Sequence, residues 1–252
     1  MLRTAVRATV ASCVAALLLP VSVAAAPAPK PHLSEILAEP PSDGYVEVQA
    51  HTPGVLEGPF DAGEYASIGG ADYGTTFLAL RNDGFIAGYA RAWVQQSPSR
   101  VLVEIVVAFS GGTGARAWLQ QSEQADLADP TFRHSISVDG IDTYYGARMS
   151  DSSSYFADAF LFVKGNDGFL VSTISGLDDL GDSAAQQTRV QYRRAPAYTI
   201  PPSGWPGARA QQLTNANFVT LGLAALALIV SGALLAAARR RRKRYSAGSS
   251  GL

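Results

Sequence analysis

The hydrophobic pattern places one long apolar segment near the C-terminus. No charged residue occurs from Phe218 to Ala238, and about 20 apolar residues are enough for a helix to cross the hydrocarbon core of a membrane. Six basic residues, 239–244, follow at once, and a basic cluster beside a spanning helix stays on the cytoplasmic side. The sequence therefore predicts a transmembrane helix over 217–238 and a basic cytoplasmic tail over 239–252.

The first 25 residues have the order of a secretory signal peptide. Arg3 and Arg7 come first, the stretch 10–23 is apolar, and small residues follow. We expect cleavage after Ala25; an uncleaved first anchor is the alternative. Cys13, the single cysteine of the chain, lies in this segment, so we expect the mature exported part to contain neither a disulfide nor a cysteine ligand.

Between these two segments the pattern alternates with a period of two residues, which is typical of half-buried strands. The runs Phe85–Gln95 and Arg100–Phe109 flank a turn at 96–99, and Tyr155–Lys164 and Phe169–Ser175 flank a turn at 165–168; both pairs read as hairpins. Further strands are predicted over Tyr45–Val48, Phe132–Val138 and Thr143–Met149. Helices are predicted over His32–Glu39, Asp72–Asn82, Ala115–Ala125 and Ala184–Arg194. Asp182 or Ser183 is expected to cap the last of them, and Asp61 or Asp72 could each cap a helix.

This order of elements indicates an α+β domain, with one antiparallel sheet and helices mostly on one face. We expect a Pro-rich leader and short helix over 26–44, the exported domain over 45–195 and a Pro-rich linker over 196–216. The element order and the hairpin-then-helix segment Phe85–Ala125 resemble exported bacterial domains of the PsbP-like kind. The whole layout is similar to that of bacterial single-pass membrane proteins with a signal peptide and an ectodomain. The resemblance covers residues 33–195 and implies a binding or scaffold role, without functional residues.

Charge separates the exported part from the rest of the chain. All 21 acidic residues and 12 of the 20 basic residues fall between the signal and the anchor, which gives this part a formal net charge of −9. An acidic domain does not suit nucleic acid, and its bulk charge does not favour anionic lipid head groups. We expect the cell membrane as its location, with the N-terminal domain outside and the C-terminus in the cytoplasm.

One face of the first hairpin provides the candidate binding site. If Gln95 pairs with Arg100, Arg91 lies directly opposite Glu104, and the two form a cross-strand ion pair. Tyr89 and Trp93 flank Arg91 on the same face, which could hold a ligand through stacking and a polar anchor. The alternative is a covered sheet face on which these four residues are structural.

The sequence favours no enzyme and predicts no catalytic residue, metal or cofactor. His32, His51 and His134 do not have metal-ligand spacing. The glycine-rich stretch 111–114 lacks the Gly-Lys-Ser/Thr ending of a phosphate loop, and Asp178, Asp179 and Asp182 lack calcium-loop spacing. We therefore expect a membrane-anchored extracytoplasmic binding module for an envelope ligand or protein. The alternatives are an accessory subunit of a membrane protein complex and, less favoured, a hydrolase.

Overall fold

A computed structural model describes residues 31–48, 56–68, 73–151 and 155–206. The predicted signal peptide, transmembrane helix and cytoplasmic tail lie outside these ranges, as do His51 and Asp72. Within the described ranges, no helix has the length and apolar character needed to cross a membrane.

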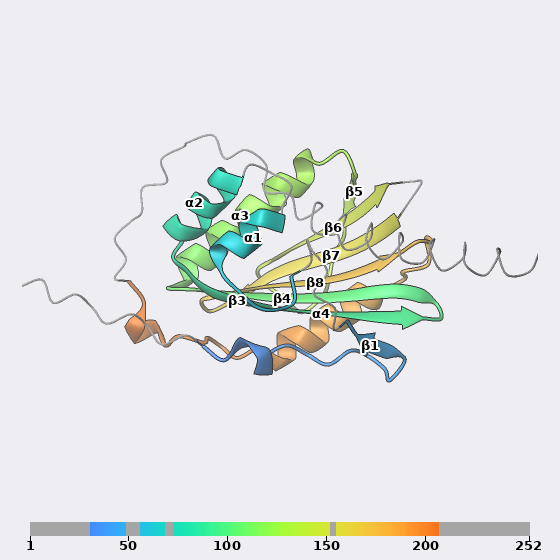
Figure 1. Ribbon diagram of the computed structural model, residues 1–252, viewed down its shortest axis with the longest axis horizontal. Helices are drawn as coiled ribbons and strands as arrows, with labels where there is room; N and C mark the ends of the chain where they lie inside the picture. The colour runs from blue at the N-terminus through green and yellow to red at the C-terminus, as the bar shows by residue number, and fades with distance from the viewer. Residues whose placement is uncertain (1–30, 49–55, 69–72, 152–154, 207–252) are drawn as a thin grey trace, which may run out of the picture.

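An eight-stranded antiparallel sheet forms the centre of the domain (Figure 1). Its strand order is β1-β3-β4-β8-β7-β6-β5, and the short strand β2 pairs with β3 beside β1. The strands are β1 (Tyr45–Glu47), β2 (Gly58–Phe60), β3 (Phe85–Gln96), β4 (Ser99–Phe109), β5 (Phe132–Ser135), β6 (Tyr144–Asp151), β7 (Tyr155–Lys164) and β8 (Asp167–Ser175).

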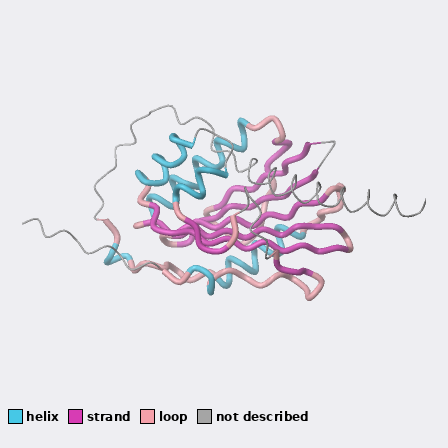
Figure 2. The backbone as a smooth tube through the Cα atoms, viewed as in Figure 1, coloured by secondary structure: helices cyan, strands magenta, loops and turns pink. Residues whose placement is uncertain are grey.

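Helices cover both faces of this sheet (Figures 1 and 2). They are η1 (Leu33–Glu35), α1 (Ala62–Ile68), α2 (Tyr73–Asn82), α3 (Gly112–Ala128), α4 (Ser183–Arg194) and η2 (Pro202–Gly204). The helices α1, α2 and α3 lie on one face, while α4 and the N-terminal segment lie on the other. The predicted α+β class is confirmed, but the second face is covered as well.

The register of the first hairpin agrees with the prediction. Gln95 pairs with Arg100, and Arg91 lies opposite Glu104. A bulge between Phe85 and Ala87 places Phe85, and not Ile86, opposite Phe109. The alternation of side chains along the strands therefore fixed the register as far as this irregularity.

Some predicted bounds differ from the structure. β8 begins at Asp167 because Gly165, with φ of 64°, and Asn166 form a two-residue turn between paired Lys164 and Asp167. β5 ends at Ser135 rather than at residue 138, and β6 runs two residues past its predicted end. The helix α3 begins inside the glycine-rich stretch, where a Cβ added at Gly114 would lie 1.9 Å from the Asp83 carbonyl oxygen. Close packing explains this glycine.

The helix α1 was not predicted as an element, although its cap was. Oδ1 of Asp61 accepts hydrogen bonds from the amides of Gly63 at 2.8 Å and Glu64 at 2.9 Å. Oε2 of Glu64 accepts one from the Asp61 amide at 2.8 Å. This reciprocal capping box satisfies amides that have no partner within the helix, which helps so short a helix to form.

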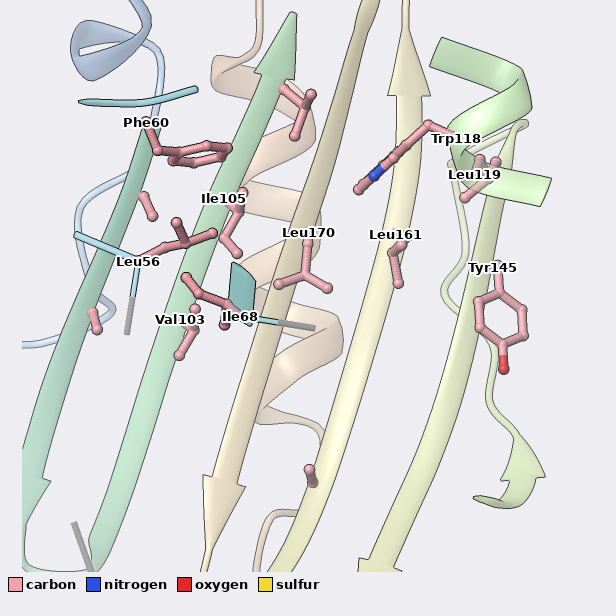
Figure 3. Close-up of a cluster of buried hydrophobic side chains, with 14 of the residues drawn as sticks. Leu56, Phe60, Ile68, Val103, Ile105, Trp118, Leu119, Tyr145, Leu161 and Leu170 are labelled. Carbon is pink, nitrogen blue, oxygen red and sulfur yellow. The ribbon is translucent and has the colours of Figure 1, made fainter. Parts of the chain in front are cut away.

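Two hydrophobic cores hold the layers together. The first lies between the sheet and α1–α3 and includes Phe60, Ile105, Trp118, Leu161 and Leu170 (Figure 3). The second lies on the other face and includes Leu37, Val106, Phe160, Phe162 and Phe169. Burial of each such side chain contributes about 1.5–3 kcal/mol, and strands β4, β7 and β8 contribute to both cores.

Both ends of the described chain belong to the domain, beyond the predicted bounds of 45 and 195. Leu33, Leu37 and Ala38 are buried. We call residues 31–41, which cross the second face, the N-terminal strap. At the other end, Thr199 and Ile200 are bonded to the β7–β8 turn, and Trp205 donates to the carbonyl oxygen of Ile200. We call residues 199–205 the C-terminal clamp segment. Segment 196–206 therefore packs on the domain instead of forming a free linker.

Asn166 holds the C-terminal clamp segment. Its buried amide donates to the carbonyl oxygen of Phe109 at 2.9 Å and to Oγ1 of Thr199 at 3.1 Å. Its Oδ1 accepts from the amides of Thr199 at 3.0 Å and Ile200 at 3.1 Å. One side chain thus joins the end of β4 to the last residues of the domain.

We expect Asn166→Ala to lower the free energy of unfolding by about 2–4 kcal/mol, because it leaves several buried backbone groups without partners. All three tryptophans lie in the described domain, so denaturant titration followed by tryptophan fluorescence reports on this domain in the full-length protein in detergent. Hydrogen exchange should become faster across residues 199–205. The control is Gln120→Ala, an exposed amide on α3; unchanged protection of 199–205 in Asn166→Ala would contradict the assignment.

Candidate functional site

The four candidate residues lie together on the sheet, but two of them are inaccessible. Trp93 is 2% exposed and Glu104 is 0% exposed. Tyr89 and Arg91 are half-buried. The N-terminal strap and α4 cover this part of the face. An open aromatic surface is therefore not present, and the alternative of a covered face describes Trp93 and Glu104 correctly.

Glu104 fixes the N-terminal strap to α4. Its Oε2 accepts the Ala38 amide at 3.0 Å, and its Oε1 accepts Nε2 of Gln187 at 2.7 Å. Burial raises the pKa of Glu104 from 4.5 to about 8, although the hydrogen bonds from Gln187 and Ala38 and the charge of Arg91 oppose this shift. At neutral pH the carboxyl therefore holds its proton in the folded state.

Two glutamines of α4 add further hydrogen bonds between this helix and the strap. We call these bonds, together with those of Glu104, the polar seam. Gln187 Nε2 also donates to the Glu39 carbonyl at 2.9 Å, and Gln191 Nε2 donates to the Ile36 carbonyl at 2.9 Å. Oε1 of Gln191 accepts the Ala38 amide at 2.6 Å. The buried side of α4 thus uses amide groups to bind the backbone of an irregular segment, which has no ladder of its own.

The expected Arg91–Glu104 ion pair is wrong, although the register is right. Arg91 makes a bidentate pair with Glu47 at 2.8 and 3.0 Å and contacts Glu39 at 3.1 Å. Its guanidinium lies 4.8 Å from the Trp93 ring centroid. These contacts raise the pKa of Arg91 and lower the pKa of Glu47. The guanidinium pairs with the carboxylates of Glu47 and Glu39 at the surface, while the Glu104 carboxyl is buried beneath the strap.

A groove of about 450 Å³ lies beside this seam. Three separate segments form it: the strap, the β2–α1 connection and the start of β3. The residues that line it are Pro31–Ser34, Pro59–Asp61, Glu64 and Ile86–Tyr89. Tyr89 is the one predicted site residue among them. Sequence reasoning missed the rest, because no local pattern brings residues 31–34 next to 59–64; the Asp61 cap was the one available signal.

The lining of the groove combines apolar walls with a few polar groups. Leu33, Phe60 and Ile86 provide apolar surface, while Tyr89, Ser34 and His32 provide groups that form hydrogen bonds. Asp61 and Glu64 bring carboxylates whose capping oxygens are already bonded to amides. No lysine or arginine belongs to the described lining. Such a surface suits a neutral or cationic small molecule, and groove volumes of this size are typical of small-molecule sites.

Other buried ionisable groups serve the fold. Burial raises the pKa of Asp83, bonded by Gln121, and of Asp167, bonded by Thr199, each to about 6. Burial also raises the pKa of Asp158, which pairs with Arg148 at 2.9 Å. In the described part of the chain, no group of three or more His, Cys, Asp or Glu side chains could hold a metal ion.

Comparison with known proteins does not assign a family. No protein-family model matches the sequence, and no curated protein matches it. Among solved structures, the chain is similar to the extracellular domain of PknH from Mycobacterium tuberculosis, with 14% identity and a TM-score of 0.41, over 65% of this chain and 98% of that chain. A similarity at this level carries no argument about function, and the PsbP-like resemblance stays a prediction.

We expect the free energy of unfolding to fall as pH rises from 6 to 8. The folded state keeps the Glu104 proton up to about pH 8, whereas the unfolded chain loses it near pH 4.5, so stability decreases across that window by up to about 1.4 kcal/mol per pH unit. Asp83 and Asp167 act in the same direction but only up to about pH 6. Glu104→Gln should therefore flatten the slope between pH 6 and 8.

Denaturant titrations at several pH values, followed by tryptophan fluorescence, measure this slope. The control is Glu123→Gln on the exposed side of α3, which should keep the wild-type slope. If Glu104→Gln has the same slope as the wild type between pH 6 and 8, Glu104 does not hold a proton in the folded state.

Proposed function

We propose that the protein is a membrane-anchored, extracytoplasmic binding module without enzymatic activity, and that the groove beside the N-terminal strap holds a small neutral or cationic envelope ligand. The groove is the observation that carries this proposal: about 450 Å³, apolar walls, convergent polar groups and no basic residue in its described lining. The predicted signal peptide and transmembrane helix support the location.

The four site residues predicted from the sequence have two different roles in this proposal. Tyr89 contacts the ligand, because it lines the groove. Arg91, Trp93 and Glu104 position the strap that forms one wall of the groove, through the ion pairs, the ring contact and the buried hydrogen bonds. They are therefore positioning residues and do not touch the ligand.

A substitution that fills the groove tests the proposal. Ser34 is exposed, lines the groove and is the middle residue of η1. Ser34→Trp should occupy the ligand volume without disturbing the core. Ser203 is the exposed middle residue of η2 and does not line the groove, so Ser203→Trp is a matched control.

Full-length protein would be purified from its native membranes in mild detergent and weighed by native mass spectrometry. We expect an additional small mass on the wild type and on Ser203→Trp, and its loss from Ser34→Trp. An additional mass retained by Ser34→Trp would place the ligand elsewhere. A bare chain mass in the wild type would overturn the ligand proposal and favour the accessory subunit, for which cross-linking in the membrane would search for the partner.

A further inference from the structure

The last described residues lie at one end of the domain, and the predicted transmembrane helix follows them closely in the sequence. The C-terminal clamp segment is bonded to the β7–β8 turn, and Trp205 packs against Gly111 and Gly112, where β4 gives way to α3. In Figure 1 this orange segment reaches the end of the sheet at which β3 begins. We call this end, made by the β7–β8 turn, the start of α3 and the C-termini of α2 and α4, the exit end.

Few residues separate the exit end from the predicted transmembrane helix. Ten residues, 207–216, lie between Pro206 and Asn217. A ten-residue chain spans at most about 36 Å, and a flexible coil of that length has a root-mean-square span of about 16–19 Å. The eleven residues of β4 alone extend about 36 Å. The exit end is therefore held near the bilayer, while the opposite end of the sheet can be much farther away.

Charge differs between the two ends. Exposed arginines gather at the exit end, from the last turn of α2, the second turn of α3 and the last turn of α4: Arg81, Arg116, Arg193 and Arg194. Arg194 also donates to the carbonyl oxygen of Glu35 at 2.8 Å. Acidic groups there are Asp83, which is partly buried and bonded to Gln121, the buried Asp167, Asp139 and Asp142 at one edge, and Glu35 beside Arg194. The groove carboxylates of Asp61 and Glu64 lie near the start of β3.

The opposite end is acidic. It carries Asp43, Glu47, Asp151, Asp178, Asp179 and Asp182. Two of its arginines are already paired, Arg100 with Asp179 and Arg148 with Asp158 and Asp178, and Arg133 donates to backbone carbonyl groups. Acidic side chains thus occur at both ends, but in the described residues Arg81, Arg116, Arg193 and Arg194 form no ion pair with a carboxylate, whereas Arg100 and Arg148 do.

Aromatic residues accompany the arginines. Tyr198 is 44% exposed and Trp205 is partly exposed, both in the last described residues. Tyrosine and tryptophan side chains favour the membrane–water interface, and basic residues near an anionic lipid surface are attracted to it. The exit end thus has the composition of a surface that contacts lipid head groups.

We propose that the exit end docks on the anionic lipid surface of the membrane that holds the anchor, so that the domain stands with its acidic end away from the bilayer. The overall charge of the domain opposes binding to anionic lipid, but this orientation separates the acidic groups from the surface. The inference rests on the membrane anchor in the proposed function, and does not depend on the ligand.

Energy transfer from the protein to the bilayer tests the orientation. Full-length protein would be reconstituted into vesicles of phosphatidylglycerol and phosphatidylcholine, or of phosphatidylcholine alone, with an acceptor dye on the lipid. A donor dye would be placed on Thr113→Cys at the exit end or on Ser97→Cys in the β3–β4 turn; both positions are exposed. We expect higher transfer from Thr113→Cys than from Ser97→Cys in vesicles that contain phosphatidylglycerol.

Dependence on charge distinguishes docking from tethering alone. The difference in energy transfer between the two positions should become smaller in pure phosphatidylcholine and in the variant R81Q/R116Q/R193Q. It should also become smaller in about 1 M salt, because the Debye length falls to about 3 Å. The control Arg133→Gln at the opposite end should retain the difference. Docking would be overturned if the two positions show equal energy transfer. It would also be overturned if their difference in transfer stays the same without anionic lipid, in high salt and in the triple variant.

Flotation of the vesicles separates this result from the proposed function. Protein that floats with the vesicles but shows no charge-dependent orientation is anchored without docking, and the binding proposal is unaffected. Protein that does not float has no anchor, and both the membrane location and the docking would be wrong.

Discussion

The central strands β4, β8 and β7 are mostly apolar and buried on both faces, and the rest of the structure follows from the need to cover them. Three helices cover one face and form the larger core. The other face is covered by α4 together with an irregular segment, the N-terminal strap. An irregular segment exposes backbone amides and carbonyls that need partners when buried. Glu104, Gln187 and Gln191 provide these partners, which explains why polar side chains lie in an otherwise apolar interior.

The sequence predicted the sheet better than its covering. Strand alternation gave the register of the β3–β4 hairpin, because a shift by one residue would reverse both faces. The strap has no such periodicity, and its partners on α4 are glutamines, which look like exposed residues. The pairing of Arg91 was wrong for a related reason: register decides which backbone positions are opposite, whereas burial decides which carboxylate the guanidinium reaches. The groove is formed by three segments that are far apart in the sequence. Tyr89 was therefore the one lining residue that had been predicted as a site residue.

The strap links the polar seam to the groove. Residues 31–34 line the groove, and residues 36–39 are bonded to α4 and to Glu104. The protonation state of Glu104 and the ion pairs of Arg91 therefore act on the same segment that forms one groove wall. Because the start of β3 also lines the groove and lies at the exit end, the groove lies in the half of the domain nearer the proposed membrane surface.

Under the proposed extracytoplasmic location, the joining of both chain ends to the domain has a consequence for export. The strap would be among the first parts of the exported chain to cross the membrane, yet its amide partner Gln191 lies 153 residues after Ala38. The β7–β8 turn likewise lacks its partner until residues 199 and 200 have crossed. Contacts of such large sequence separation form late. An exported domain of this kind would reach its native state only after translocation is almost complete, and the chain would remain unfolded while it crosses a narrow secretion channel.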